Sequence, residues 1–143
     1  MRIKPPHIAL TLLILSWIMG KYLPQFNFGS SKIGILILVL GLSMTFYSFY
    51  LFKKNKTPII PVTKPTFVVM EGVYNFTRNP MYLGVTIALL GASVYIGNWV
   101  SLLSPLIFFI IINAVYIPFE EKLMENLFGK KYLDYKKKVR RWI

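Results

Sequence analysis

The sequence predicts an all-α integral membrane protein: four transmembrane helices, the last two forming a helical hairpin, followed by a C-terminal interfacial amphipathic helix. The composition is the first reason. Hydrophobic residues make up 55% of the 143 residues and charged residues only 15%, and the mean hydropathy is +0.55. So few polar side chains cannot cover a water-facing surface, which leaves lipid as the solvent. We expect a single membrane domain, residues 1–143.

The length of the uncharged stretches is the second reason, and it places the spans. Residues 8–23 form the first span, with Lys21 near its end reaching toward the headgroups. Residues 33–52 form the second and carry no charge. The stretch from 79 to 119 is also uncharged, but it is too long for one crossing of a core of about 30 Å. A break at Gly97-Asn98 divides it into spans at residues 81–96 and 99–119.

The segments between and after the spans have a different character. Pro58, Pro61 and Pro65 predict a loop without helix or strand before the third span. Pro118 should bend the fourth span where it leaves the bilayer. After Gly129, aromatic and apolar residues recur every three or four positions among lysines and arginines. This pattern predicts an interfacial helix with a basic polar face.

Charge sets the orientation. With four spans, both termini and the loop before the third span lie on one side of the membrane. Apart from Lys21 and Lys32, all of the 17 lysines and arginines fall on that side. The positive-inside rule therefore places both termini in the cytoplasm, together with all five acidic residues. We expect an integral protein of the inner or plasma membrane if the organism is a prokaryote.

Several residue types are missing, and their absence narrows the possible functions. The chain has no cysteine, and His7 is its only histidine, which excludes a disulfide framework, a thiol nucleophile and a Cys/His metal site. It has no Gly-x-Gly-x-x-Gly segment and no Walker loop. The basic tail lacks any known nucleic-acid-binding context, so we expect it to bind anionic lipid headgroups. We expect neither nucleic acid nor metal as a partner.

Two clusters carry possible chemistry. In the first, Arg78 precedes Asn79-Pro80, which suits the start of a helix with Asn79 as N-cap and Pro80 as the first helical residue. Unpaired backbone N–H groups there would bind an anion, although an ordinary helix cap beside a positive-inside arginine explains the same residues. In the second, Glu120-Glu121 follows an uncharged span. These carboxylates need a cation, either Arg78 or a charged ligand, unless both lie in headgroup water.

Small residues line one face of the third span at Gly84, Ala88 and Gly91. Small side chains at this spacing let another helix approach closely, and helix packing is the favoured interpretation. The alternative is that they leave room for a ligand between helices.

Five segments carry a family resemblance. They are Gly72-Val73-Tyr74, the run Thr-Arg-Asn-Pro-Met-Tyr-Leu-Gly at 77–84, the pair Glu120-Glu121, residues 127–135, and Arg141-Trp142-Ile143. Together, in this order and spacing, they resemble the isoprenylcysteine carboxyl methyltransferase family and the related phospholipid methyltransferases, in a short bacterial or archaeal form. The resemblance covers residues 57–143.

The resemblance implies an integral membrane methyltransferase that uses S-adenosylmethionine. The cofactor would lie in a cytoplasmic pocket formed by residues 57–84 and 120–143, where Arg78 and Glu121 are the candidate catalytic residues. A lipophilic small molecule or a lipid would accept the methyl group, and we expect it to enter between the third and fourth spans. The candidate cofactor-binding residues are Tyr74, Asn79, Pro80, Met81, Tyr82, Gly84 and Glu120.

Two positions depart from the family's pattern. Asn79 stands where the family most often has histidine. Tyr116 stands where the eukaryotic enzymes have an arginine near the substrate carboxylate, so we assign Tyr116 to the substrate site. We therefore expect a neutral or amine-bearing acceptor, or a lipid headgroup. The alternatives are a non-catalytic membrane protein that keeps the fold and a related NADPH-dependent membrane reductase, but the spacing from Glu120-Glu121 to Phe-Gly-x-x-Tyr favours the methyltransferase.

Overall fold

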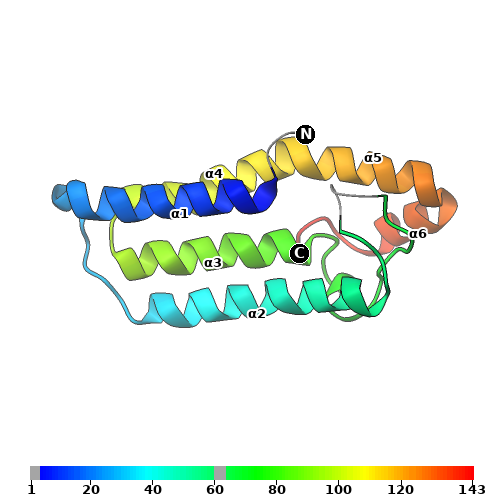
Figure 1. Cartoon of the computed structure of the whole chain (residues 1–143), viewed down its shortest axis with the longest axis horizontal. Helices are drawn as coiled ribbons and strands as arrows, with labels where there is room; N and C mark the ends of the chain where they lie inside the picture. Colours follow the sequence, from blue (N-terminus) through cyan, green and yellow to red (C-terminus); the bar gives the residue numbers. More distant parts are fainter. Residues whose placement is uncertain (1–3, 60–63) are drawn as a thin grey trace.

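The computed structural model describes residues 4–59 and 64–143, which form helices and loops without a β-strand in these ranges. Helix α3 (Pro80–Ile96) runs through the middle of the bundle (Figure 1). Helix α2 (Ile33–Lys54) lies on one side of it, and α1 (Pro5–Tyr22) and α4 (Leu103–Ile111) lie on the other. Short 3₁₀ turns occur at Pro24–Phe26, Gly72–Asn75 and Val100–Leu102.

Two helical stretches are long and apolar enough to cross a membrane, Ile33–Lys54 and Val100–Phe128, and α3 is a shorter apolar helix. The second stretch has 29 residues, which at 1.5 Å per residue is about 43 Å. A bilayer core is only about 30 Å thick. The charged last part of this helix, from Glu120 onward, therefore extends beyond the membrane-spanning segment.

The helix widens just before Pro118, where the sequence predicts a bend. A π-helical turn, Ile112–Tyr116, joins α4 to α5 (Ile117–Phe128), and the N–H of Ile117 donates to the carbonyl of Ile112. A proline inside a regular helix loses one hydrogen bond and collides with the carbonyl four residues earlier. The wider turn accommodates that collision, so the helix continues through Pro118 into α5.

Glycines bring α2 and α3 into close contact, which confirms helix packing as the use of the small-residue face. A Cβ at Gly84 would overlap the backbone of α2 at Gly41 and Thr45. A Cβ at Gly91 would overlap Gly34 and Leu38 in the same way. Only hydrogen at these positions allows the two backbones to approach this closely.

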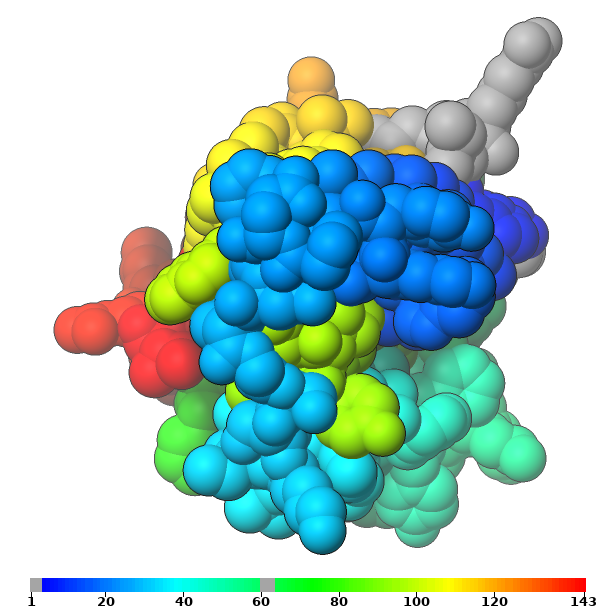
Figure 2. All heavy atoms as spheres, turned by 90° about the vertical axis from the view of Figure 1, so that its left-hand side faces the viewer, coloured from blue at the N-terminus to red at the C-terminus, as the bar shows by residue number. Residues whose placement is uncertain are grey.

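The predicted break at Gly97-Asn98 is confirmed. Gly97 ends α3 with φ of 72°, a left-handed conformation that glycine adopts without strain. Asn98 is fully buried, and its Nδ2 donates to Leu23 O (3.0 Å) and Asn27 Oδ1 (2.8 Å). Figure 2 looks onto this end of the molecule, where the connection from α1 to α2 crosses the bundle.

At the other end, α6 (Lys130–Lys138) folds back beneath α5 toward the start of α3 (Figure 1). Its aromatic residues Tyr132 and Tyr135 are buried and pack with Val68 of the preceding loop. The interfacial helix predicted after Gly129 corresponds in its bounds to α6. Residues 120–128 continue the long helix, and the apolar face of α6 covers a protein core because the loop supplies matching apolar side chains.

Candidate active site

An ion-pair cluster organises the end of the bundle at which α3 begins. Arg78, just before α3, places Nη2 2.9 Å from Glu121 Oε1 on α5. Arg141 approaches the same carboxylate from the segment after α6, with Nη2 2.9 Å from Oε2. The Arg78 and Glu121 side chains are only 8% and 7% exposed. Arg78 thus pairs with Glu121, one of the two partners that the sequence analysis considered for the glutamates. Arg141 is a second cation that pairs with Glu121.

The electrostatic balance keeps Glu121 ionised. Burial by itself raises the pKa of Glu121, but the hydrogen bond from Arg141 and the charges of Arg78, Arg141 and Lys136 outweigh it. The pKa of Glu121 is therefore held below its ordinary value. Removing either arginine would leave a buried charge partly unpaired, which is costly in a poorly solvated site.

Glu120, the neighbouring carboxylate, lies in a different environment. Consecutive helical residues point about 100° apart, so Glu120 faces α3 and accepts a hydrogen bond from the Tyr82 hydroxyl at 2.5 Å. Burial raises the pKa of Glu120 to about 7, even though the bond from Tyr82 lowers it. Two adjacent glutamates thus differ in charge near neutral pH: Glu121 is anionic, and Glu120 is poised between its two forms.

Asn79 is the N-cap residue of α3 as predicted, but its side chain makes no capping hydrogen bond. Its Nδ2 instead donates to the carbonyl of Arg141 at 3.0 Å. The Asn79 N–H bonds to Thr77 Oγ1 (3.2 Å), and Pro80 is at the start of α3 as predicted. The amide of Asn79 therefore joins the loop before α3 to the segment after α6.

Two small cavities adjoin this cluster. They measure ≈ 80 and ≈ 70 Å³ and share the lining residues Phe52, Tyr74, Arg78, Asn79 and Glu120. The first extends under α6 to Met124, Tyr132 and Tyr135. The second extends toward α3 at Met81 and Tyr82.

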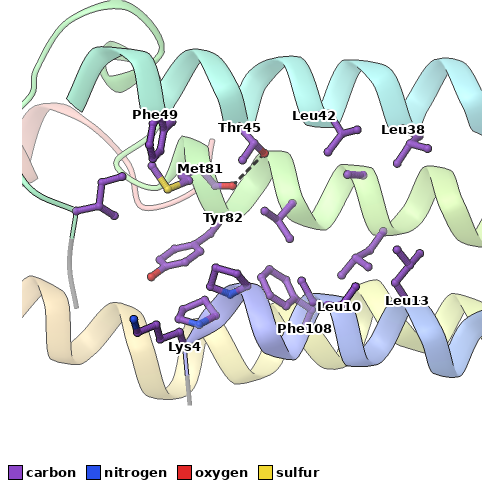
Figure 3. Close-up of a pocket in the computed structure, with 17 residues that line it drawn as sticks. Lys4, Leu10, Leu13, Leu38, Leu42, Thr45, Phe49, Met81, Tyr82 and Phe108 are labelled. Carbon is purple, nitrogen blue, oxygen red and sulfur yellow. Dashed lines mark hydrogen bonds between the residues drawn. The ribbon is translucent and has the colours of Figure 1, made fainter. Parts of the chain in front are cut away.

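A larger apolar cavity of ≈ 540 Å³ continues from Met81 and Tyr82 along the bundle. Figure 3 shows side chains of α1 and α2 facing each other across it, with Leu10 and Leu13 on α1 and Leu38 and Leu42 on α2. Among its lining residues only Lys4, Thr45 and Tyr82 carry polar side chains. This cavity, called the groove below, lies between α1 and α2 over α3, and not between the third and fourth spans as expected.

The structure brings most of the predicted site residues together. Tyr74, Arg78, Asn79, Met81, Tyr82, Glu120 and Glu121 all line the two small cavities. Pro80 is buried at the helix start, Gly84 packs on α2, and Tyr116 lies in the core cluster with Phe108 and Ile112.

The sequence analysis included Arg141 in the Arg141-Trp142-Ile143 segment but assigned it no role, and it did not single out Asn113, an amide within an apolar span. The signal that could have found Asn113 is the cost of an unpaired amide at membrane depth, which demands a partner.

Comparison with known proteins agrees with this arrangement. The phospholipid methyltransferase family model matches residues 30–131. Over 111 residues the chain is 27% identical to protein-S-isoprenylcysteine O-methyltransferase B of Arabidopsis thaliana, covering 76% of this chain and 56% of the plant protein. Over 79 residues it is 34% identical to protein-S-isoprenylcysteine O-methyltransferase of Schizosaccharomyces pombe, covering 53% of this chain and 32% of the yeast protein.

A shorter relative is also similar. An uncharacterized protein of Haemophilus influenzae is 41% identical over 63 residues, which is its whole length and 44% of this chain. The chain spans about half or less of the two named enzymes, yet the family model covers most of the chain, including the loop, α3 and Glu120-Glu121. The chain belongs to the phospholipid methyltransferase family.

Proposed function

We propose that this protein is a membrane methyltransferase that moves a methyl group from S-adenosylmethionine to a lipophilic or lipid-like acceptor. One observation carries the proposal. The apolar groove and the second small cavity share Ile59, Met81 and Tyr82, so a lipid-like molecule and a polar cofactor would meet beside Tyr82 and Glu120. The methyltransferase names of the relatives support the reaction class.

The residues of the two small cavities fit the cofactor's chemistry. Arg78 Nε is buried without a hydrogen-bond partner among the described residues, and a buried donor of this kind needs an acceptor such as the cofactor's carboxylate. Glu120 offers a carboxylate to the cofactor's cationic groups. Tyr74 and Phe52, whose ring centroids are 5.6 Å apart, offer aromatic faces to a ring or a cation.

The volumes indicate that the pocket must widen on binding. Pockets for ligands of this size usually measure about 300–1,000 Å³, whereas the two small cavities measure ≈ 80 and ≈ 70 Å³. The loop before α3 borders both cavities, and α6 borders the first. We expect a small displacement of these elements to join the two cavities.

The chemistry asked of the chain is mainly positioning. When bound, the cofactor supplies an activated methyl group: its S–CH₃ bond breaks as the bond from the acceptor to the methyl forms. The groove aligns the acceptor with the cavities, and its apolar walls exclude water. Such alignment contributes about 7–11 kcal/mol of barrier reduction, so neither a metal nor a nucleophilic side chain is required.

The groove also bears on the acceptor. Its walls suit an alkyl or isoprenoid chain, and a buried carboxylate without a fixed cation would be costly there. A neutral or amine-bearing headgroup near Tyr82 therefore fits better than a carboxylate. Lys4 is the one cation among the described residues that line the groove, and it lies at the same end as the Tyr82 hydroxyl (Figure 3). There it would pair with headgroup phosphates, which leaves no groove cation for an acceptor carboxylate.

We further propose four spans, formed by α1, α2, α3 and residues 99–119, with the site and both termini in the cytoplasm. The exposed lysines Lys130 and Lys131 would then face anionic headgroups. Reporter fusions at Gly29 and Gly97 should be read as external, and fusions at Lys64 and after α6 as internal. An external reading after α6 would refute this topology.

Equilibrium binding to detergent-purified protein tests the function. We expect S-adenosylmethionine and its demethylated product to bind, and NADPH not to bind. NADPH binding alone would favour the related membrane reductase, and binding of none of the three would favour a non-catalytic membrane protein. The same preparation with labelled methyl donor and lipid extract then tests transfer.

A further inference from the structure

Residues 139–143, which follow α6, lie across the cytoplasmic site and are called the strap. On the cofactor side, the carbonyl of Arg140 accepts from Arg78 N–H at 3.0 Å. The carbonyl of Arg141 accepts from Thr77 Oγ1 (3.1 Å) and Asn79 Nδ2 (3.0 Å). The strap thus fixes the backbone and side chains of the loop that enters α3.

The Arg141 side chain adds an ionic contact on the same side. Its Nε and Nη2 atoms donate to the two oxygens of Glu121, at 3.1 and 2.9 Å. Glu121 also holds Arg78, which lines both small cavities and whose buried Nε has no hydrogen-bond partner among the described residues. Arg141 therefore sets the position of Glu121 and, through it, that of Arg78.

The next residue, Trp142, reaches the acceptor side. Its Nε1 donates to Asn113 Oδ1 at 3.0 Å, and its ring lies 4.6 Å from that of Phe109. Asn113 belongs to the π-helical turn, and Trp142 packs against the core cluster that contains Phe108 and Leu89. Phe108 and Leu89 also line the groove.

Two consecutive residues therefore connect to the two halves of the site, Arg141 through Glu121 and Trp142 through the core cluster that borders the groove. Asn113 Oδ1 accepts a hydrogen bond from Trp142 Nε1 and a weaker one, at 3.4 Å, from Arg141 Nη1. These two hydrogen bonds satisfy the side-chain oxygen of Asn113, a polar residue within an apolar helix. Since aligned reactants must be held within a fraction of an ångström, an element that touches both sites can control their relative placement.

We infer that the strap is a positioning element of the methyl-transfer site. Arg141 holds the cofactor-facing pair Arg78 and Glu121. The Trp142–Asn113 hydrogen bond fixes the helix that carries the groove wall relative to this pair. This inference rests on the proposed function. It assigns roles to Arg141, Trp142 and Asn113 that are distinct from contact with the reacting atoms.

The two contacts predict different kinetic effects. Arg141→Ala should raise the cofactor Kd at least tenfold, and Arg141→Lys, which keeps one charge for Glu121, should recover part of that loss. Trp142→Phe keeps the ring and removes the N–H. It should leave the cofactor Kd within twofold and lower kcat at saturating cofactor by about fivefold or more.

A double-mutant cycle isolates the hydrogen bond. Asn113→Ala and Trp142→Phe should each lower kcat, and the double variant should be no slower than the slower single variant, since both remove one interaction. Lys138→Ala, an exposed cation just before the strap, is the matched control and should behave as the wild type. Each variant is measured in detergent with labelled S-adenosylmethionine and lipid extract, alongside its thermal unfolding midpoint.

The outcomes separate the inference from the proposed function. A wild-type protein that binds no S-adenosylmethionine refutes the proposed function, and the inference with it. A wild type that binds and transfers while Arg141→Ala keeps a normal Kd refutes the inference alone. The inference is also wrong if all strap variants melt at lower temperature but the protein that stays folded has wild-type Kd and kcat.

Discussion

The environment of Glu120 predicts that cofactor affinity depends on pH near neutrality. Burial raises the pKa of Glu120 to about 7, well above the ordinary value of about 4.3 for glutamate. The cofactor's cationic groups favour the carboxylate form, so binding must expel the proton wherever Glu120 is still protonated. The affinity for S-adenosylmethionine is therefore highest at pH values above the raised pKa of Glu120, and it falls as the pH drops through that pKa.

The magnitude follows from the same value. If only the carboxylate form binds, the apparent Kd is about twofold higher at pH 7 than at high pH, about elevenfold higher at about pH 6, and then tenfold higher for each further unit. One unit corresponds to about 1.4 kcal/mol. An ordinary glutamate would give a flat profile over this range, because it stays ionised.

Equilibrium binding of S-adenosylmethionine from about pH 5.5 to 7.5 measures the effect. Glu120→Gln should bind more weakly at the upper end by about 1.5–3 kcal/mol, the usual contribution of a charged hydrogen bond, and its profile should be flat. Asp134→Asn changes an exposed carboxylate on α6 and should keep the wild-type profile. A wild-type profile without slope, or a Glu120→Gln profile with the wild-type slope, would show that Glu120 does not face the cation.

Three further perturbations test the site, the packing and the acceptor. Tyr82→Ala removes the hydrogen bond to Glu120 and should weaken cofactor binding by one to several kcal/mol. The control Lys137→Ala changes a side chain that is 79% exposed and should not weaken binding. Equal losses in the two variants would indicate general destabilisation. Gly41→Ala places a methyl group against the backbone of Ala88 and should lower the free energy of unfolding by about 1–3 kcal/mol. The exposed control Ser43→Ala should stay near neutral, and a Gly41→Ala protein as stable as the wild type would contradict the close helix contact. In a labelled-methyl assay, neutral or amine-bearing lipids should be better acceptors than a farnesylcysteine analogue, and efficient carboxyl methylation of that compound would refute the argument from the groove.

The sequence by itself determined the long apolar helices and the residues that gather in the candidate site. Residues 33–52 could be recognised as a span because hydropathy is a local property, and the span was found with its end shifted by two residues, to Lys54. The break at Gly97 was predictable because glycine readily takes the left-handed conformation that ends a helix. The cluster of Tyr74, Arg78, Tyr82 and the glutamates was recognisable from motif order.

The tertiary structure alone decided what these residues contact. Asn79 has the local signature of an N-cap, but its amide bonds to Arg141, 62 positions away. The aromatic face of α6 matches a lipid interface equally well, and only the presence of Val68 opposite it makes it a core. The groove likewise depends on how α1 lies relative to α2 across α3. Local sequence patterns specify which helix faces are apolar. Which faces pack together depends on contacts between segments that are distant in sequence, and local patterns do not encode those contacts.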